Sequence, residues 1–186
     1  MAVLVIAGSG RGAGKTAVGC ALMAAMPEFR WTAVKVTPHW HGISGRVWEE
    51  TESDSEKDTA RYLRAGAVRT FLISDETEDD GERIMEIIRQ IPREGWLLVE
   101  SNRVEAGRIA EKNEPAICLA VVTKDEEEWK PSLRGRIEGA DAVLTVGGMF
   151  AKKVAPVLRG KQVFWLPEGA WTSAEIVKFV RSWLKG

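Results

Sequence analysis

GSGRGAGKT, residues 8–16, follows directly on the apolar run Val3 to Ala7 and leads into a second apolar run, Ala17 to Met23. The first run is rich in β-branched residues and predicts a strand, whereas the second predicts a helix that ends before Pro27. Glycines between a strand and a helix let backbone amides turn toward an anion, and the start of the helix adds its unpaired N–H groups. The stretch is therefore a candidate phosphate-binding loop, or P-loop.

The chemistry of this loop predicts which groups would contact a nucleoside triphosphate. Lys15 would supply charge to the β and γ phosphates, and Thr16 would offer its hydroxyl to Mg²⁺. The expected backbone donors belong to Gly10, Gly12, Ala13, Gly14, Lys15, Thr16 and Ala17. The literal pattern G-x-x-x-x-G-K-[ST] is not met, because its first position is Ser9. A glycine-rich turn without a ligand is the alternative interpretation.

Outward from the loop, short apolar runs alternate with helical stretches along the whole chain. The expected strands are Val3 to Ala7, Ala33 to Val36, Thr70 to Ile73, Trp96 to Val99, Ala116 to Val122, Ala142 to Val146 and Val163 to Leu166. Most of these runs lack polar alternation, as is typical of a parallel sheet covered on both faces. We expect an α/β fold, a P-loop NTPase-type three-layer sandwich with a mostly parallel sheet of about seven strands.

A magnesium site requires an acid remote from the loop in sequence. Glu100 ends the apolar run Trp96 to Val99, so its carboxylate would emerge where the strand ends meet the loop. We predict that Glu100 holds Mg²⁺, through water, or positions the attacking water. Asp54 and Asp58 are further candidates, although capping of a helix is the simpler role for Asp58.

Two basic residues add to the predicted site. Arg11 lies within the loop itself, so we hypothesise that it stabilises the phosphate being transferred. The predicted catalytic residues are therefore Lys15, Glu100 and Arg11. Lys35 lies in an otherwise apolar strand, where an unpaired charge would be costly, so it either faces the nucleotide or extends to solvent at the strand end.

Composition limits the class of protein. The 186 residues are enough for one substantial core, so residues 1–186 are expected to form a single nucleotide-binding domain. A net charge of -1 gives no basic field for nucleic acid, and the apolar runs are too short to span a membrane. The two cysteines, Cys20 and Cys118, do not form a disulfide framework. We expect a cytoplasmic location, because the N-terminus lacks the features of a signal peptide.

Several local signals carry weaker predictions. The stretch from His39 to Lys57 has little periodicity and is interpreted as a long surface loop. In it, His39 and His41 could bind a transition metal or a phosphate, but no third ligand is adjacent. Thr123 to Glu126 follows a buried strand, as the guanine-reading element of many GTPases does, although a charged turn is the simpler interpretation.

Two helix starts and one helix end are also predicted. Ser55 with Asp58, and Thr172 with Glu175, match the capping-box pattern. Gly66 is expected to end the first of these helices in a left-handed conformation.

Four segments in the right order resemble the MobB proteins of molybdopterin-guanine dinucleotide biosynthesis. The phosphate loop matches at residues 12–16, and the segment 33–39, AVKVTPH, looks like the family's second strand. Residues 54–58, DSEKD, followed by Ala-Gly-Ala at 65–67, are similar to its lysine-aspartate helix, and residues 97–100, LLVE, resemble the strand that ends in its glutamate. The family's glycine after that glutamate is Ser101 here.

The resemblance implies a GTP-binding protein that uses Mg²⁺, hydrolyses GTP slowly and assists molybdenum cofactor biosynthesis. It also implies a molybdenum-cofactor nucleotidyltransferase as partner, and a homodimer is the expected assembly. Three alternatives stay open: an ATP-dependent ligase or transferase similar to dethiobiotin synthetase, a nucleotide-binding adaptor without hydrolysis, and a small-molecule kinase. The sequence does not decide between GTP and ATP.

Overall fold

One twisted sheet organises the computed structural model, which describes residues 1–38, 47–75, 81–123, 131–147, 158 and 160–184. The eight strands lie in the order β3-β4-β2-β5-β1-β6-β7-β8, and all are parallel to their neighbours except β3, which runs antiparallel to β4. The strands are β1 (Val3–Gly8), β2 (Thr32–Thr37), β3 (Val47–Glu50), β4 (Arg69–Ser74), β5 (Leu97–Glu100), β6 (Ala116–Val122), β7 (Ala142–Val146) and β8 (Gln162–Leu166).

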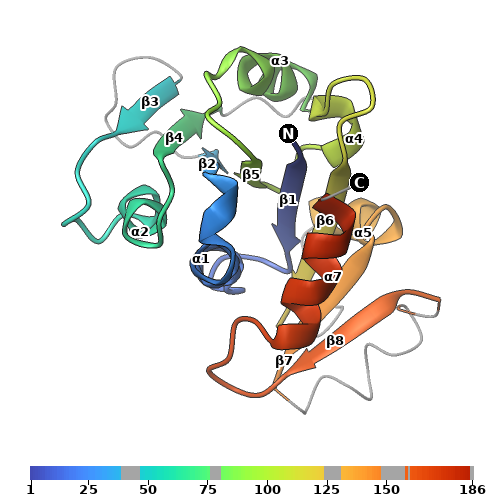
Figure 1. Ribbon diagram of the computed structural model, residues 1–186. Coiled ribbons are helices and arrows are strands. Elements are labelled where there is room, and N and C mark those ends of the chain that lie inside the picture. Colours follow the sequence, from blue (N-terminus) through green and yellow to red (C-terminus); the bar gives the residue numbers. More distant parts are fainter. Residues whose placement is uncertain (39–46, 76–80, 124–130, 148–157, 159, 185–186) are drawn as a thin grey trace.

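Helices cover both faces of this sheet and make it the middle of three layers (Figure 1). On one face lie α1 (Lys15–Ala25), α2 (Asp58–Arg64) and α7 (Ala174–Leu184). On the other lie α3 (Glu82–Gln90), α4 (Ala106–Ile109) and α5 (Pro131–Glu138). A short 3-10 turn, η1 (Pro27–Phe29), connects α1 to β2. The predicted α/β three-layer sandwich is confirmed.

Successive residues of the central strands contribute to opposite cores, because side chains alternate between the two faces of a strand. Val3 and Val5 of β1 belong to the core under α3, α4 and α5, whereas Leu4 and Ile6 belong to the core under α1, α2 and α7. All four are fully buried. The absence of polar alternation in the sequence of β1 thus follows from burial on both faces.

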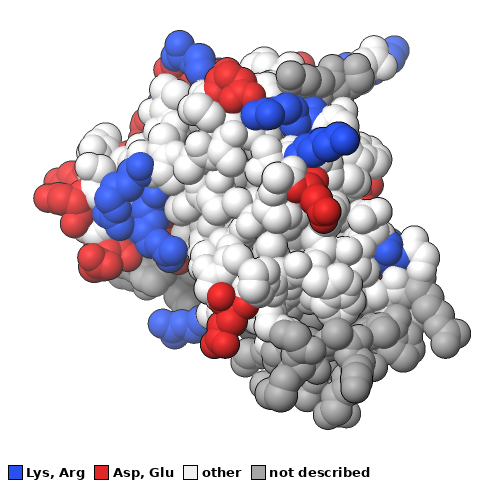
Figure 2. All heavy atoms as spheres, turned by 60° about the horizontal axis from the view of Figure 1, so that its bottom comes forward, with Lys and Arg blue, Asp and Glu red and all other residues white. Residues whose placement is uncertain are grey.

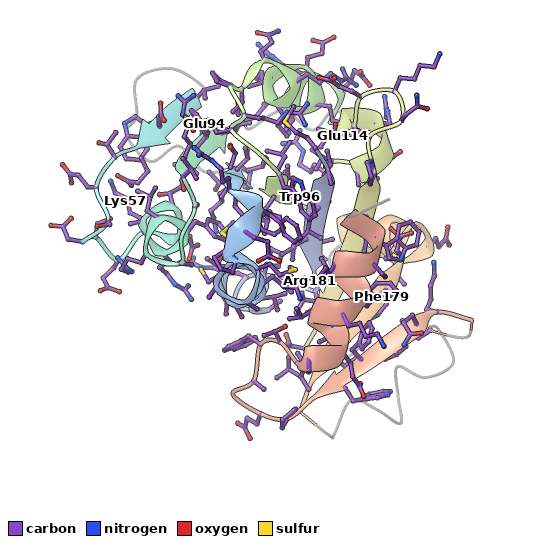
Figure 3. All side chains as sticks on the ribbon, in the orientation of Figure 1. Lys57, Glu94, Trp96, Glu114, Phe179 and Arg181 are labelled. Carbon is purple, nitrogen blue, oxygen red and sulfur yellow. The ribbon has the colours of Figure 1, made fainter. Side chains whose placement is uncertain are left out.

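The outer elements are tied to the centre by aromatic and ionic contacts. The Trp96 ring, directly before β5, stacks on Phe29 of η1 with a centroid separation of 3.4 Å. Arg181 of α7 donates to the Glu28 carboxylate at 2.9 Å, which joins α7 to the segment after α1. Figure 3 labels Trp96 near the middle of the molecule and Arg181 on the side of α7 that faces α1.

All seven predicted strands are present, and the eighth strand was missed. Strand β3 lies inside the stretch from His39 to Lys57, which was predicted to be a loop, and that prediction is wrong for Val47–Glu50. Its outer position explains the error. An edge strand pairs on one side only and needs no continuous apolar run, and Glu49 of β3 is held instead by Arg69 of β4 at 2.7 Å.

Both predicted capping boxes are wrong, whereas the predicted helix end is confirmed. Helix α2 begins at Asp58 after Lys57 with no side-chain cap, and the Ser55 hydroxyl makes no hydrogen bond in the described structure. At α7 the capping residue is one position later than predicted. Ser173 Oγ, and not the Thr172 hydroxyl, accepts a hydrogen bond from the Ile176 amide at 3.3 Å. Gly66 has φ +103°, the left-handed conformation expected after a helix.

Candidate functional site

The loop between β1 and α1 has the backbone geometry of an anion-binding turn. Gly12 and Gly14 have φ of +78° and +85°, a region that strongly favours glycine. Gly14 has a second constraint, because a Cβ atom there would lie 2.0 Å from the Trp171 ring. This indole, from the segment between β8 and α7, therefore packs directly against the loop backbone, and Gly14 is required on both grounds.

The amino end of α1 presents amides that the helix itself does not use. Its first i to i−4 bond is the one from the Val18 amide to the Gly14 carbonyl, at 2.9 Å. The amides of Lys15, Thr16 and Ala17 precede that bond, and Gly14 provides no side-chain cap. Helix-terminal N–H groups with the positive end of the helix dipole favour a bound anion.

Lys15 lies along the loop it belongs to. Its aliphatic carbons pass over Gly8, where a Cβ atom would be 2.7 Å from Lys15 Cγ, and its Nζ donates to the Gly10 carbonyl at 3.0 Å. Gly8 therefore leaves the space that the lysine stem occupies. This bond holds the ammonium against the loop, where it would meet a phosphate.

Two neutral contacts fix the start of the loop. The Asn102 side chain accepts from the Gly8 amide at 2.8 Å and donates to the Gly8 carbonyl at 2.9 Å. The buried Ser9 hydroxyl accepts from the Thr123 amide at 3.1 Å. The serine at the first motif position thus links the loop to the end of β6. The role of Asn102 was missed, because no motif includes this residue.

Glu100 is the centre of a buried hydrogen-bond network at the end of β5. Its Oε2 accepts from Thr16 Oγ1 and from the Tyr62 hydroxyl, each at 2.7 Å, and its Oε1 accepts from Lys35 Nζ at 3.0 Å. Only 4% of Glu100 is exposed, so each of these bonds replaces one to water. Helices α1 and α2 and strand β2 are joined at this one carboxylate.

Lys35 connects Glu100 to Asp58. The two strands place Lys35 beside Glu100 in register, and the ammonium also donates to Asp58 at the start of α2. Burial alone would lower the pKa of Lys35, but Glu100 and Asp58 outweigh burial and raise that pKa above its ordinary value. Burial likewise opposes ionisation of Asp58, yet hydrogen bonds from Lys35 and Arg61 lower its pKa. Both groups are charged at neutral pH.

Tyr62 closes the network from the opposite side. It is fully buried, and burial together with the neighbouring Glu100 charge raises the pKa of its phenol well above the ordinary value. The phenol therefore stays protonated and donates to Glu100. Tyr62 was not predicted from the sequence, although its spacing of four residues from Asp58 places both on one face of α2 and was a usable signal.

The donor set around Thr16 fits a hard divalent cation that is shared with phosphates. Mg²⁺ prefers oxygen ligands, usually one or two protein groups that supplement phosphate and water. Thr16 supplies a hydroxyl, and Glu100 lies in direct contact with it. Among the described residues, no group of three or more His, Cys, Asp and Glu side chains could hold a metal ion.

The remaining predicted residues divide into those near this network and those away from it. Arg11 is exposed at the tip of the loop, and Asp54 is exposed between β3 and α2. Asp58, in contrast, belongs to the network. His39, His41 and Glu126 lie outside the described residues.

Figure 2 shows the molecule from the end toward which β1 points in Figure 1. Basic and acidic side chains both gather on this view, mostly around its margin, and a broad area between them belongs to other residue types. The described surface in this view carries no field of a single sign, consistent with the net charge of -1. No helix of the described part is long and apolar enough to cross a membrane.

Comparisons with known proteins identify the fold. No protein-family model and no curated protein sequence matches the chain. Among solved structures, the hydrogenase maturation factor HypB from Archaeoglobus fulgidus matches with TM-score 0.57 and 14% identity over 99% of this chain and 90% of that one. HypB from Helicobacter pylori, in complex with nickel, matches with TM-score 0.53 and 12% identity over 100% and 86%.

A third match is LpxK from Aquifex aeolicus in complex with ATP, with TM-score 0.50 and 15% identity. The matched region covers 89% of this chain but only 53% of the LpxK chain. These likenesses show that the chain has the P-loop NTPase fold, as predicted. They do not test the resemblance to MobB or the choice of nucleotide.

Proposed function

We propose that the protein binds GTP with Mg²⁺ at the loop of residues 8–16, hydrolyses it slowly and couples the nucleotide state to molybdenum cofactor maturation. The observation that carries the nucleotide site is the contact of Thr16 with the buried Glu100 at the end of the adjacent strand. It joins the hydroxyl expected on a nucleotide-bound metal to a remote acid, as the chemistry of phosphoryl transfer requires.

The residues of the loop would each contact a different part of the bound nucleotide and metal ion. Backbone amides from Gly10 to Ala17 would surround the phosphate oxygens, and Lys15 would add a mobile positive charge. Mg²⁺, when bound, would offset phosphate charge and polarise the phosphoryl group. Thr16 would hold it directly, and Glu100 would orient the Thr16 hydroxyl and accept hydrogen bonds from metal-bound water.

Arg11 would act on the transferred phosphate from the tip of the loop. Its side chain is exposed, so it can move toward a bound triphosphate without breaking a buried contact. Arginine in such a position stabilises charge in the transition state. We expect Arg11→Ala to lower the rate of phosphate release and to leave triphosphate affinity nearly unchanged.

Guanine is the proposed base because the resemblance to MobB implies GTP, and the sequence after β6 adds a weaker signal. Thr123 begins a sequence similar to a guanine-reading element, and its amide is bonded to Ser9 of the loop at 3.1 Å. The end of β6 therefore lies beside the start of the loop. The proposed role in cofactor maturation rests on the resemblance of four segments to MobB, with a nucleotidyltransferase of that pathway as the partner.

Calorimetric titration tests the nucleotide assignment. GTP and ATP, each with and without Mg²⁺, are titrated into the wild-type chain and into Lys15→Ala, with Lys178→Ala of the exposed α7 surface as the matched control. Loss of a charge-assisted bond should weaken triphosphate binding by about tenfold to a hundredfold in Lys15→Ala alone.

The outcomes separate the candidate functions. Tighter binding of GTP supports the proposal, whereas tighter binding of ATP favours the ligase similar to dethiobiotin synthetase. Binding of GTP with no phosphate release, even with the partner supplied, favours the adaptor. No affinity for any triphosphate at millimolar concentration would reject the site itself.

A further inference from the structure

Lys35 is a charged side chain that the proposed phosphate chemistry does not use. Its ammonium donates to Glu100 at 3.0 Å and to Asp58, so it contacts both carboxylates of the network at once. About a fifth of the side chain is exposed, and Glu100 is almost completely buried. The Lys35 ammonium therefore lies close to Thr16 and Glu100, the place where Mg²⁺ is expected.

We propose that Lys35 makes magnesium binding dependent on nucleotide, by acting as the internal counter-cation of Glu100 and Asp58. The inference rests on the proposed function, because it concerns the metal of the same site. Without nucleotide, the two carboxylates are compensated by Lys35, so they attract little Mg²⁺. With nucleotide, the phosphates supply the additional negative charge that a divalent cation needs.

The charge of the surrounding groups supports this role. Asp58 is also paired with Arg61 of its own helix, at 3.1 Å, so the two carboxylates face two cations. The other polar contacts of Glu100 come from the neutral hydroxyls of Thr16 and Tyr62. Lys35 is therefore the cation that directly contacts the buried Glu100 carboxylate.

The sheet limits how the network can rearrange when a metal ion binds. Lys35 and Glu100 are register partners on adjacent parallel strands, and β2 is bonded on both sides by β4 and β5. The backbone positions of the two residues are thus set by the sheet. Any rearrangement on metal binding is limited to the lysine side chain and to Asp58 on α2.

The test measures Mn²⁺, a spectroscopic probe for Mg²⁺, by the electron paramagnetic resonance signal of the free ion. Titrations use the full chain with and without GTP, in the wild type, Lys35→Met and Lys35→Arg. Lys178→Met, which removes one exposed lysine from α7, controls for the change in net charge. Circular dichroism melting confirms that each variant is folded.

Without nucleotide, Lys35→Met should bind Mn²⁺ about tenfold more tightly or better, because the nearest positive charge is removed from a weakly screened site. Lys35→Arg and Lys178→Met should resemble the wild type. An unchanged Mn²⁺ affinity in folded Lys35→Met, or an equal gain in Lys178→Met, would overturn the proposal.

The wild type alone also tests the proposal, should Lys35→Met not fold. Mn²⁺ uptake should then require GTP, and tight uptake by the nucleotide-free protein would contradict the role of Lys35. Failure of the proposed function would give a different result. Calorimetry would then detect no GTP binding, whatever the Mn²⁺ affinity of the variants.

Discussion

The two sides of the phosphate loop are held by different kinds of interaction. Toward β5 and β2, Thr16 enters a charged network made by Glu100, Lys35 and Asp58. On the other, neutral side, the start of the loop is held by Asn102, two residues after β5, which bonds to Gly8, and by Thr123, directly after β6, which donates to Ser9. The neutral side fixes the shape of the loop, and the charged side is the one that can respond to a cation. Variants on the two sides should therefore have different effects.

The largest effect is expected on the charged side, from Glu100→Ala. Lys35 and the Tyr62 hydroxyl both donate hydrogen bonds to Glu100, and this variant removes their common acceptor. The free energy of unfolding should therefore fall by about 3 kcal/mol. Urea unfolding at neutral pH measures this loss. Glu94→Ala, which breaks an exposed pair with Arg30, should cost less than about 1 kcal/mol. Equal losses in the two variants would contradict the assigned importance of burial.

On the neutral side, Asn102→Ala should lower the free energy of unfolding by about 1–3 kcal/mol, because the Gly8 amide and carbonyl both lose their side-chain partner. Asn102→Asp keeps the acceptor for the Gly8 amide but cannot donate to the carbonyl, and should give an intermediate loss. Triphosphate affinity should fall with and without Mg²⁺ alike, as calorimetry would show. A loss seen only with Mg²⁺ would place Asn102 on the charged side of the comparison.

A smaller effect is expected from Ser9→Ala, which removes only the hydroxyl that accepts from Thr123. The expected loss in unfolding free energy is about 1 kcal/mol, with triphosphate affinity near that of the wild type. Ser9→Gly restores the literal motif and should bind equally well. A large gain in affinity in Ser9→Gly would show that the serine distorts the loop.

The smallest effect concerns pH and Asp58. The pKa of this carboxyl is lower in the folded chain than its ordinary value, so its contribution to stability is present at neutral pH and is lost as pH falls through the folded pKa. Lys35 has a raised pKa, so its contribution is lost only at high pH, as pH rises through the folded pKa. Unfolding of Asp58→Asn should accordingly depend less on pH on the acid side than unfolding of the wild type. Identical acid profiles would show that Asp58 is not stabilised by the network.

Local patterns in the sequence were sufficient for the elements and for the loop. The strand over Ala116–Val122 was predicted with its observed bounds, because burial on both faces leaves a continuous apolar run. Glu100 was predicted at a strand end and is the last residue of β5. The capping boxes failed because a short pattern of polar residues does not specify which hydroxyl reaches the helix amides. Strand β3 was missed because an edge strand has a weak signal.

The sequence by itself determined the alternation of strands and helices, the position of the phosphate loop and the identity of Lys15 and Thr16 within it, since these depend on neighbours along the chain. Only the tertiary structure decided that Lys35 lies beside Glu100, that α2 brings Asp58 and Tyr62 to the same carboxylate, and that Asn102 holds Gly8. The physical reason is strand order. Strands β2 and β5 are neighbours in the sheet although β3 and β4 lie between them in the chain, and no local pattern specifies that pairing.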